Sequence, residues 1–353
     1  MPLAPSFALP VLTAPTLAAA GASTITHSDA TTWLRHALGG PTWLHLPGED
    51  ASRCRVITTL LHGNEPSGVL ALHRWLGEAP RPRVSLAILV ANVAAALAPP
   101  IFTHRIAPGG RDLNRCFRPP FGDASGELAR RIAMDIAAWA PECVIDLHNT
   151  SGSGPAFAVA LARDPAIERL ASHFCDRLIV SDFRLGSLME LPLTAPTLAD
   201  CPIFTLECGG ARDPAALEVA ADVYRRLGDW PDLAALTPAP GLEVLIHPLR
   251  VELRPGASLA YARGPEPGAD ITLWARIDTC NRGITDPTTC LGWLGEGGLR
   301  YLQAVDARGS DRLGELLCAR NGRLYPRRPL RLFMATTNAE IARSDCLFYA
   351  VPE

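Results

Sequence analysis

The chain has 353 residues, a hydrophobic content of 48% and a formal net charge of -3, which is typical of a globular protein with two domains. It contains no basic tract interleaved with aromatic residues and no apolar run as long as a membrane-spanning helix, so we expect neither nucleic acid nor a membrane as a partner. All 33 basic residues are arginine, which excludes a lysine Schiff base in catalysis.

Residues 1–50 include an apolar, alanine-rich stretch that lacks the positively charged start of a signal peptide and is interrupted by prolines. We interpret them as an extended N-terminal segment that packs on the domain that follows. The ten cysteines form no C-x-x-C pair, which predicts reduced and mostly buried thiols in a cytoplasmic protein.

Strand-like and helix-like segments alternate between residues 51 and 235. The strand-like segments are 53–62, 83–92, 143–149, 156–161 and 202–210, and the helix-like segments are 67–76, 124–140, 164–178 and 213–230. Asp-Pro opens the last two helices, where the aspartate caps the helix and proline occupies its first turn. Continuous apolar strands separated by helices predict an α/β fold, with a mostly parallel mixed sheet covered by helices on both faces.

The pattern changes after a proline-rich linker near residues 231–241. Short strand-like segments follow at 242–253, 270–277, 323–326 and 330–335, separated by Gly, Pro and Asp. We therefore predict a domain at 51–235 and a smaller β-rich C-terminal domain at 242–353.

Four motifs place chemically active side chains at or near strand ends: HGNE at 62–65, DLNR at 112–115, DLHN at 146–149 and TLECGG at 205–210. Because the carboxyl ends of parallel strands meet in one crevice, these side chains can converge there. His62, Glu65 and His148 form the two-nitrogen, one-carboxylate set that zinc hydrolases use, which leaves a fourth position for water. Asp146 lies on the same side of its strand as His148 and can hold the imidazole or a nearby arginine.

The remaining polar residues suit hydrolysis by a metal-bound water. Glu207 is the acid at the last strand end and is the candidate general base. Asn114 and Arg115 offer a neutral donor and a guanidinium for a substrate carboxylate, and Arg105 is the candidate that stabilises an oxyanion.

Each motif alone has a simpler explanation. An H-x-x-E turn is common by chance, DLNR can be a turn with an exposed ion pair, and Glu207 can cap a helix. Their order along the chain, each at a strand end, favours the metal site.

Taken together, HGNE, DLNR, DLHN and the E-x-G at 207–209 resemble the succinylglutamate desuccinylase/aspartoacylase family, a branch of the zinc carboxypeptidase-like superfamily. The resemblance covers residues 55–225 and implies a zinc carboxypeptidase-like fold for the catalytic domain. It implies one Zn²⁺ per chain, with the metal ligands, the base and the Asn-Arg pair as assigned above. It also implies an upstream arginine that polarises the scissile carbonyl, which we place at Arg105, with Arg111 as its competitor.

The sequence departs from the family pattern before the glutamate base. Aspartoacylases carry a Tyr and an Arg there that grip a second substrate carboxylate, and residues 191–207 contain neither. Arg212 or Arg184 could replace that arginine, and a solvated loop charge is the simpler interpretation of Arg184. The tyrosine that faces the substrate from the C-terminal domain in this family also has no match, so N-acetylaspartate specificity is unsupported.

The sequence thus predicts a zinc-dependent amidohydrolase that deacylates a small, carboxylate-bearing N-acyl amino acid. Alternatives are a zinc carboxypeptidase or amidase acting on short peptides, and a catalytically silent binding protein of the same fold. A serine or cysteine hydrolase is disfavoured, since no G-x-S-x-G occurs. Whether the protein forms a homo-oligomer stays open.

Overall fold

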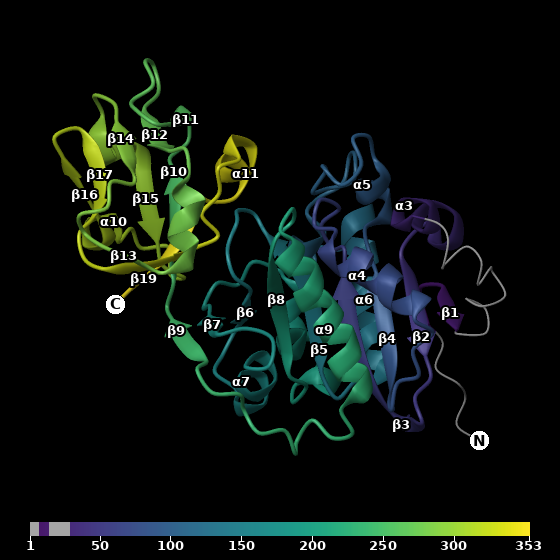
Figure 1. Cartoon of the computed structure of the whole chain (residues 1–353). Coiled ribbons are helices and arrows are strands. Elements are labelled where there is room, and N and C mark those ends of the chain that lie inside the picture. Colours follow the sequence, from purple (N-terminus) through teal and green to yellow (C-terminus); the bar gives the residue numbers. More distant parts are fainter. Residues whose placement is uncertain (1–6, 14–28) are drawn as a thin grey trace. The chain divides into compact units, whose positions relative to one another are not determined.

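The computed structural model describes residues 7–13 and 29–353 (Figure 1). Residues 1–6 and 14–28, which belong to the predicted N-terminal segment, lie outside the described residues. The chain divides into two units. The first comprises the described residues up to Asn149, Ala156–Leu178 and Arg184–Glu243, and the second comprises Thr150–Pro155, Ile179–Phe183 and Val244–Glu353.

A large mixed sheet has the strand order β1-β2-β4-β3-β5-β8-β6-β7-β9. Its strands are β1 (Val11–Thr13), β2 (Thr42–Leu46), β3 (Asp50–Thr59), β4 (Val84–Val90), β5 (Val144–Thr150), β6 (Phe157–Ala160), β7 (Arg177–Val180), β8 (Ile203–Gly210) and β9 (Glu243–Ile246). β3 pairs in parallel with β4 and β5, whereas β2 pairs with β4 and β6 with β8 in antiparallel fashion. The prediction of a mostly parallel mixed sheet is confirmed.

Helices cover both faces of this sheet, as predicted. The helices and helical turns of the first unit are α3 (Ala30–Trp33), η1 (Leu34–Leu38), α4 (Ser67–Gly77), α5 (Val93–Leu97), η2 (Leu113–Arg115), α6 (Ala124–Trp139), α7 (Pro165–Ala171), η3 (Leu188–Glu190), α8 (Leu191–Thr194), η4 (Pro196–Leu198) and α9 (Pro214–Asp229). α4 packs against α9, and α6 buries Ile132 and Ile136 against the opposite face (Figure 1). Every residue of β4, β5 and β8 is buried, which explains the apolar sequence of β4 and the apolar start of the other two strands.

The Asp-Pro starts of α7 and α9 are confirmed, because Asp164 accepts a hydrogen bond from the backbone N–H of Ala166 and Asp213 from that of Ala215. The predicted helix at 164–178 is too long, however. α7 ends at Ala171, and Arg177–Val180 forms β7 instead. The branched, apolar end of that segment is buried in a sheet, where such side chains pack well.

The second unit contains two further sheets, with orders β13-β18-β19-β10-β15 and β11-β12-β14-β17-β16, which agrees with the predicted β-rich character. Its elements are β10 (Leu249–Leu253), β11 (Leu259–Ala262), β12 (Ile271–Trp274), η5 (Ile277–Arg282), β13 (Ile284–Thr285), β14 (Gly292–Leu294), η6 (Gly298–Tyr301), β15 (Leu302–Val305), α10 (Leu313–Leu316), β16 (Leu317–Arg320), β17 (Arg323–Pro326), β18 (Leu330–Phe333), α11 (Ala339–Ser344) and β19 (Phe348–Pro352). A core of aliphatic side chains joins the two sheets. Among the described residues of the whole chain, no helix has the length and apolar character needed to cross a membrane.

Candidate active site

The loop between β3 and α4 carries His62 and Glu65, and close packing fixes its path. Leu60 begins the turn with a φ of 62°, a left-handed conformation that is rare for a bulky residue. Gly63 has no room for a side chain, because a Cβ there would lie 2.5 Å from the Cβ of Ala95 on α5. The glycine of the HGNE motif is therefore needed for the loop to lie against α5.

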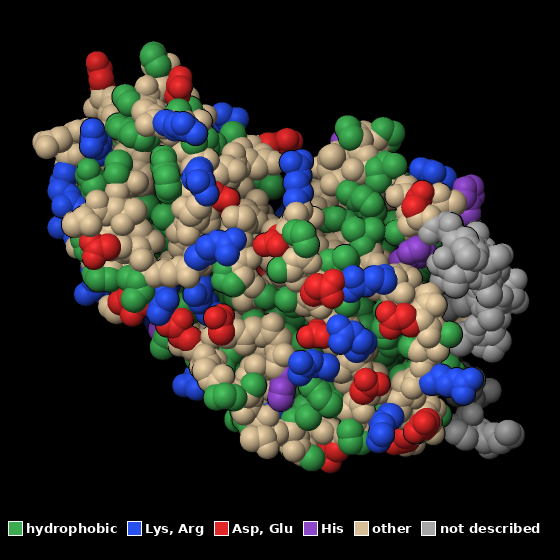
Figure 2. Space-filling model, viewed as in Figure 1, with side chains coloured by type: hydrophobic (Ala, Val, Ile, Leu, Met, Phe, Trp, Pro, Cys, Tyr) green, Lys and Arg blue, Asp and Glu red, His purple; other side chains and the backbone are tan. Residues whose placement is uncertain are grey.

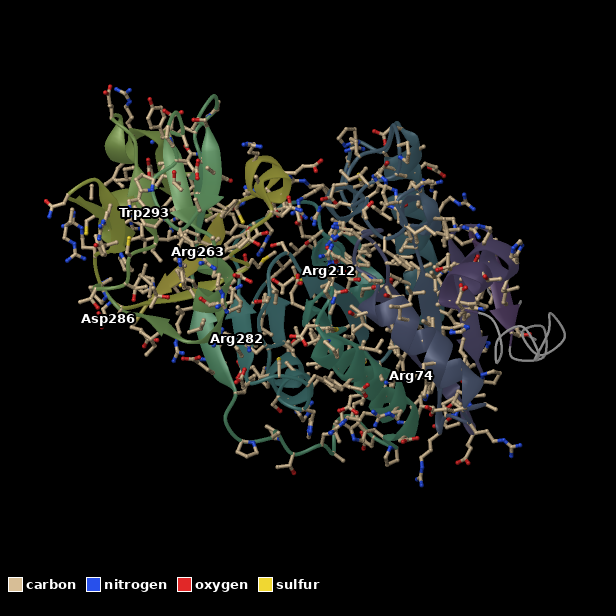
Figure 3. The ribbon with its side chains drawn as sticks, turned by 45° about the horizontal axis from the view of Figure 1, so that its top comes forward. Arg74, Arg212, Arg263, Arg282, Asp286 and Trp293 are labelled. Carbon is tan, nitrogen blue, oxygen red and sulfur yellow. The ribbon has the colours of Figure 1, made fainter. Side chains whose placement is uncertain are left out.

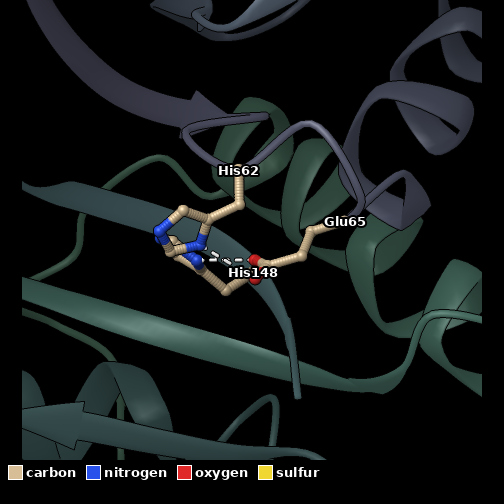
Figure 4. Close-up of side chains that lie close together, drawn as sticks. All are labelled: His62, Glu65 and His148. Atoms are coloured by element: carbon tan, nitrogen blue, oxygen red, sulfur yellow. Dashed lines mark hydrogen bonds and ion pairs between the residues drawn. The ribbon is translucent and has the colours of Figure 1, made fainter. Parts of the chain in front are cut away.

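His62, Glu65 and His148 converge from this loop and from β5 (Figure 4). Nδ1 of His62 is 2.8 Å from Oε1 of Glu65, and Nδ1 of His148 is 2.7 Å from Oε2 of the same carboxylate. One ligand atom from each residue lies within 4.8 Å of the others, and all three residues are buried. The three side chains could hold a metal ion, and no other His, Cys, Asp or Glu triplet of this kind occurs in the described part of the chain.

The outer nitrogen of each imidazole faces a carboxylate. Nε2 of His62 is 2.9 Å from Oδ1 of Asp112, and Nε2 of His148 is 2.7 Å from Oδ2 of Asp146. Each imidazole thus lies between two carboxylates, with Nε2 toward Asp112 or Asp146 and Nδ1 toward Glu65 at the centre of the cluster. Thr58 in turn donates its hydroxyl proton to Asp146 across 2.6 Å.

The cluster pairs buried carboxylates with positively charged or protonatable side chains. Burial opposes the charge of Glu65, yet the imidazoles of His62 and His148 keep the pKa of Glu65 below its usual range. Burial also opposes the charge of Asp112, but His62 and Arg105 lower the pKa of Asp112. Burial would lower the pKa of His148, which Asp146 and Glu65 nevertheless raise well above its ordinary value. Glu65 and Asp112 therefore favour the ionised form, and His148 favours the protonated form beside Glu65.

Arg105 lies beside this cluster, whereas Arg111 does not. The guanidinium of Arg105 is 3.0 Å from Oδ2 of Asp112 through one nitrogen and 3.4 Å from Oε1 of Glu65 through another. The guanidinium of Arg111 instead binds both carboxylate oxygens of Asp123 at the exposed start of α6. The structure thus brings only one of the two candidate arginines to the predicted ligands.

Glu207 has an unusual environment for a carboxyl group. It lies on β8 directly opposite Phe157 of β6, and only 7% of its surface is exposed. Its Oε2 is buried and has no hydrogen-bond partner among the residues that the structure describes. Burial is the main reason that the pKa of Glu207 is raised to about 7. This carboxyl group can therefore exchange a proton near neutral pH.

Asn114 and Arg115 lie at the edge of the cluster in the turn that Asp112 caps. Oδ1 of Asp112 accepts a hydrogen bond from the backbone N–H of Asn114 at 2.9 Å. The amide nitrogen of Asn114 is 3.5 Å from Nε2 of His148, and Arg115 donates to the backbone carbonyl of Asn114. In the DLNR motif, Asp112 therefore contacts His62, while Asn114 and Arg115 are suited to bind a carboxylate.

Asn149 is a structural residue to which the sequence analysis gave no role. Its backbone N–H donates to Oε2 of Glu65 at 3.2 Å, and its side-chain amide bonds both Ser67 at the start of α4 and the carbonyl of Gly209 at the end of β8. Asn149 therefore ties three elements of the site together. Its position directly after His148 in DLHN was the only signal available.

Arg212 lies in the turn between β8 and α9 and is exposed (Figure 3). It makes no hydrogen bond or ion pair with any residue that the structure describes. The turn follows the strand that carries Glu207, so Arg212 lies at the same end of the strands as the cluster.

A family model for the succinylglutamate desuccinylase/aspartoacylase catalytic domain matches residues 55–217, the stretch that holds the whole cluster. Residues 55–217 are therefore similar to the catalytic domain of this family. The resemblance drawn from the four motifs is thereby confirmed, and members of this family are deacylases. A comparison with curated proteins found no match.

Solved structures share the fold. A succinylglutamate desuccinylase/aspartoacylase from Rhodobacter sphaeroides aligns over 85% of this chain and 86% of its own, with a TM-score of 0.51 and 15% identity. A protein named for the same two activities, from Shewanella frigidimarina, aligns over 88% of this chain and 92% of its own, with a TM-score of 0.52 and 14% identity. At these identities the likeness establishes the fold of the chain and nothing about its substrate.

Proposed function

We propose that the protein is a zinc-dependent amidohydrolase that cleaves the amide bond of a small N-acyl amino acid bearing a carboxylate. The observation that carries this proposal is the convergence of His62, Glu65 and His148, together with the buried Glu207, which interacts electrostatically with all three and has an oxygen without a described partner. The match of residues 55–217 to the catalytic domain of a deacylase family supports this class of reaction.

The residues fit a zinc ion well. Two imidazole nitrogens and one carboxylate, with Nδ1 of each ring directed inward, are a ligand set that zinc takes in hydrolases. A zinc ion held by His62, Glu65 and His148 would supply Lewis acidity and lower the pKa of a bound water. Asp112 and Asp146 would fix the orientation of the two rings.

Glu207 and Arg105 have separate roles in the proposed reaction. Glu207 takes a proton from the attacking water and later delivers it to the departing amine, which its pKa near 7 permits in both directions. We assign oxyanion stabilisation to Arg105, because its guanidinium borders Glu65 while Arg111 is engaged by Asp123.

Asn114 and Arg115 bind the substrate carboxylate and hold the scissile amide in place, which converts a random encounter into an oriented one. We assign Arg212 to a second anionic group of the substrate, since it is exposed and unengaged. The free state of all ten cysteines fits a cytoplasmic location.

The first test measures metal content and turnover separately. E207Q should retain zinc and lose nearly all hydrolysis of N-acyl amino acids, whereas E78Q, at an exposed glutamate, should behave like the wild type. H62A should lose stoichiometric zinc by elemental analysis, and H36A, at an exposed histidine, should keep it. Wild-type turnover in E207Q would remove Glu207 from the mechanism, and full zinc occupancy in H62A would overturn the ligand assignment.

The second test addresses the substrate class. A panel of N-acyl amino acids and dipeptides, assayed at equal concentration, separates a deacylase from a carboxypeptidase. We expect hydrolysis of N-acyl amino acids with a free carboxylate and no hydrolysis of the matching amides.

A further inference from the structure

Acidic and basic side chains are interspersed over the surface of the first unit on the face that Figure 2 shows. Glu190 differs from these surface groups, because it is only 4% exposed and forms no ion pair with any residue that the structure describes. Its Oε1 instead accepts hydrogen bonds from two backbone N–H groups, that of Gly186 at 2.6 Å and that of Ser187 at 3.1 Å. Glu190 thereby holds the path of residues 186–190, which include η3 and which we call the η3 loop.

The η3 loop packs directly against the DLNR motif and the residues that follow it. The carbonyl oxygen of Gly186 accepts a hydrogen bond from the backbone N–H of Phe117 at 2.9 Å. Gly186 has a φ of 78°, and a Cβ on it would lie 2.6 Å from the carbonyl oxygen of Arg115. The side chain of Leu188 is fully buried in the same apolar core as Phe117. The loop and the motif are therefore held together by hydrogen bonds and by close packing.

The η3 loop also determines how the amide of Asn114 is oriented. Oδ1 of Asn114 accepts a hydrogen bond from the backbone N–H of Leu188 at 2.9 Å, which turns Nδ2 toward His148. The distance from Nδ2 to Nε2 of His148 is 3.5 Å, the outer limit of a hydrogen bond, and Asp146 already faces that nitrogen at 2.7 Å. An amide nitrogen has two N–H donors, so at least one N–H of Asn114 remains available to a ligand.

We propose that Glu190 is a positioning residue for the substrate carboxylate and that it acts through the η3 loop and Asn114. Glu190 shapes the loop, and the loop presents the N–H of Leu188 that orients the amide of Asn114. A donor whose direction is fixed before binding lowers the entropy that its contact with the ligand costs. This inference rests on the proposed function, because it assumes that Asn114 binds a carboxylate of the substrate.

The first test removes the single N–H that joins the loop to Asn114. L188P deletes this donor, whereas L188A shortens the side chain and keeps the donor. Proline suits the local backbone, because Leu188 is the first residue of η3 and Ser187 before it is extended, with a φ of -80° and a ψ of 163°.

The measurement is a nitrogen–proton NMR correlation spectrum of the labelled full-length protein. The side-chain amide signal of Asn114 is assigned by its absence in N114A. We expect this signal to move in L188P and in E190A and to stay close to its wild-type position in L188A and E190Q, because glutamine keeps an acceptor oxygen. An Asn114 signal that moves in neither L188P nor E190A would overturn the inference.

The second test measures kcat/KM for the N-acyl amino acid that the wild type hydrolyses best. E190A should lower kcat/KM by about tenfold to a hundredfold, as expected when a binding group is displaced, and E190Q should stay within about threefold of the wild type. In an N114A background, E190A should change kcat/KM by less than about twofold, because the two residues act as one unit.

Asp135 provides a matched control, because it is also a buried carboxyl group that accepts a backbone hydrogen bond, from Leu9, and a second bond from Nε1 of Trp43. Any effect of D135A on kcat/KM should be the same with and without N114A. Urea unfolding and zinc content would show that each variant is folded and loaded.

The two tests separate this inference from the proposed function. A wild type that hydrolyses none of the N-acyl amino acids would refute the proposed function, while the Asn114 signal would still decide whether Leu188 and Glu190 orient the amide. In an active enzyme, effects of E190A and N114A that multiply would overturn the inference, because Glu190 would then be only a helix cap. An E190Q variant as impaired as E190A would also overturn it.

Discussion

Glu207→Gln offers a thermodynamic test of the candidate site that needs neither metal nor substrate. In the folded protein the pKa of Glu207 is raised to about 7 by burial, whereas its ordinary value is 4.5. Between these pH values the folded protein therefore holds a proton that the unfolded chain has released. The unfolding free energy of the wild type must fall as the pH rises through this interval, because the unfolded state binds fewer protons.

The size of the effect follows from the two pKa values. Each pKa unit corresponds to about 1.4 kcal/mol, so the full interval is worth about 3 kcal/mol. Glutamine carries no proton to lose. The unfolding free energy of E207Q minus that of the wild type should be near zero at pH 4 and should reach about 3 kcal/mol in favour of E207Q at pH 8.

The assay is urea unfolding of chelator-treated protein from pH 4 to pH 8, followed by tryptophan fluorescence. Glu65 and Asp112 also titrate differently in the folded state, but they are present in both proteins, so the part of their contribution that does not depend on Glu207 cancels in the difference. E78Q, at an exposed position, should show no pH-dependent difference from the wild type. A flat difference for E207Q, or one that grows toward low pH, would refute the argument that Glu207 is held in an environment that disfavours its charge.

Three further changes test other parts of the site. In steady-state assays, R105A should lower kcat by about a hundredfold or more with little change in KM, as expected for lost oxyanion stabilisation. R111A should leave kcat unchanged. Equal losses of kcat in the two variants would contradict the assignment of the oxyanion role to Arg105. G63A should lower the unfolding free energy by about 3 kcal/mol, because its Cβ would overlap Ala95. Chemical denaturation measures this loss, and a change below about 0.5 kcal/mol would show that the loop can move away from α5. D112N should weaken zinc binding about tenfold to a hundredfold in chelator competition, since the ring of His62 would lose its charged partner. Unchanged affinity would mean that Asp112 does not orient that ring.

The sequence is sufficient to predict the central strands, the starts of two helices and the convergence of the motifs that follow the strands. Continuous apolar segments of strand length favour strands buried on both faces, and the Asp-Pro pairs mark the starts of α7 and α9. Because parallel strands end at one edge of a sheet, the motif that follows each strand is brought to a common place. This reasoning is sufficient to predict that His62, Glu65 and His148 lie together.

The remainder depends on loop paths, for which the sequence has no periodic signal. Which of Arg105 and Arg111 lies beside the cluster depends on the course of the chain from α5 to η2, since Arg111 binds Asp123 instead. Likewise, the bond from Asn149 to Gly209 requires the spacing of β5 and β8 in three dimensions. Arg177–Val180 belongs to a strand because of its neighbours in the sheet, so a helical pattern that extends into it was misleading.

The course of the chain also constrains how this protein can be divided. Thr150, the last residue of β5, belongs to the second unit although His148 is only two residues earlier. Ser153 of the same segment binds Asp278 through its hydroxyl, and a Cβ on Gly152 would lie 2.0 Å from the carbonyl oxygen of Ala335. A truncated fragment that starts at residue 242 would lack Thr150–Pro155 and Ile179–Phe183, which belong to the second unit. We therefore expect this fragment to be insoluble. Gene fusions built on this protein should keep both units on one uninterrupted polypeptide.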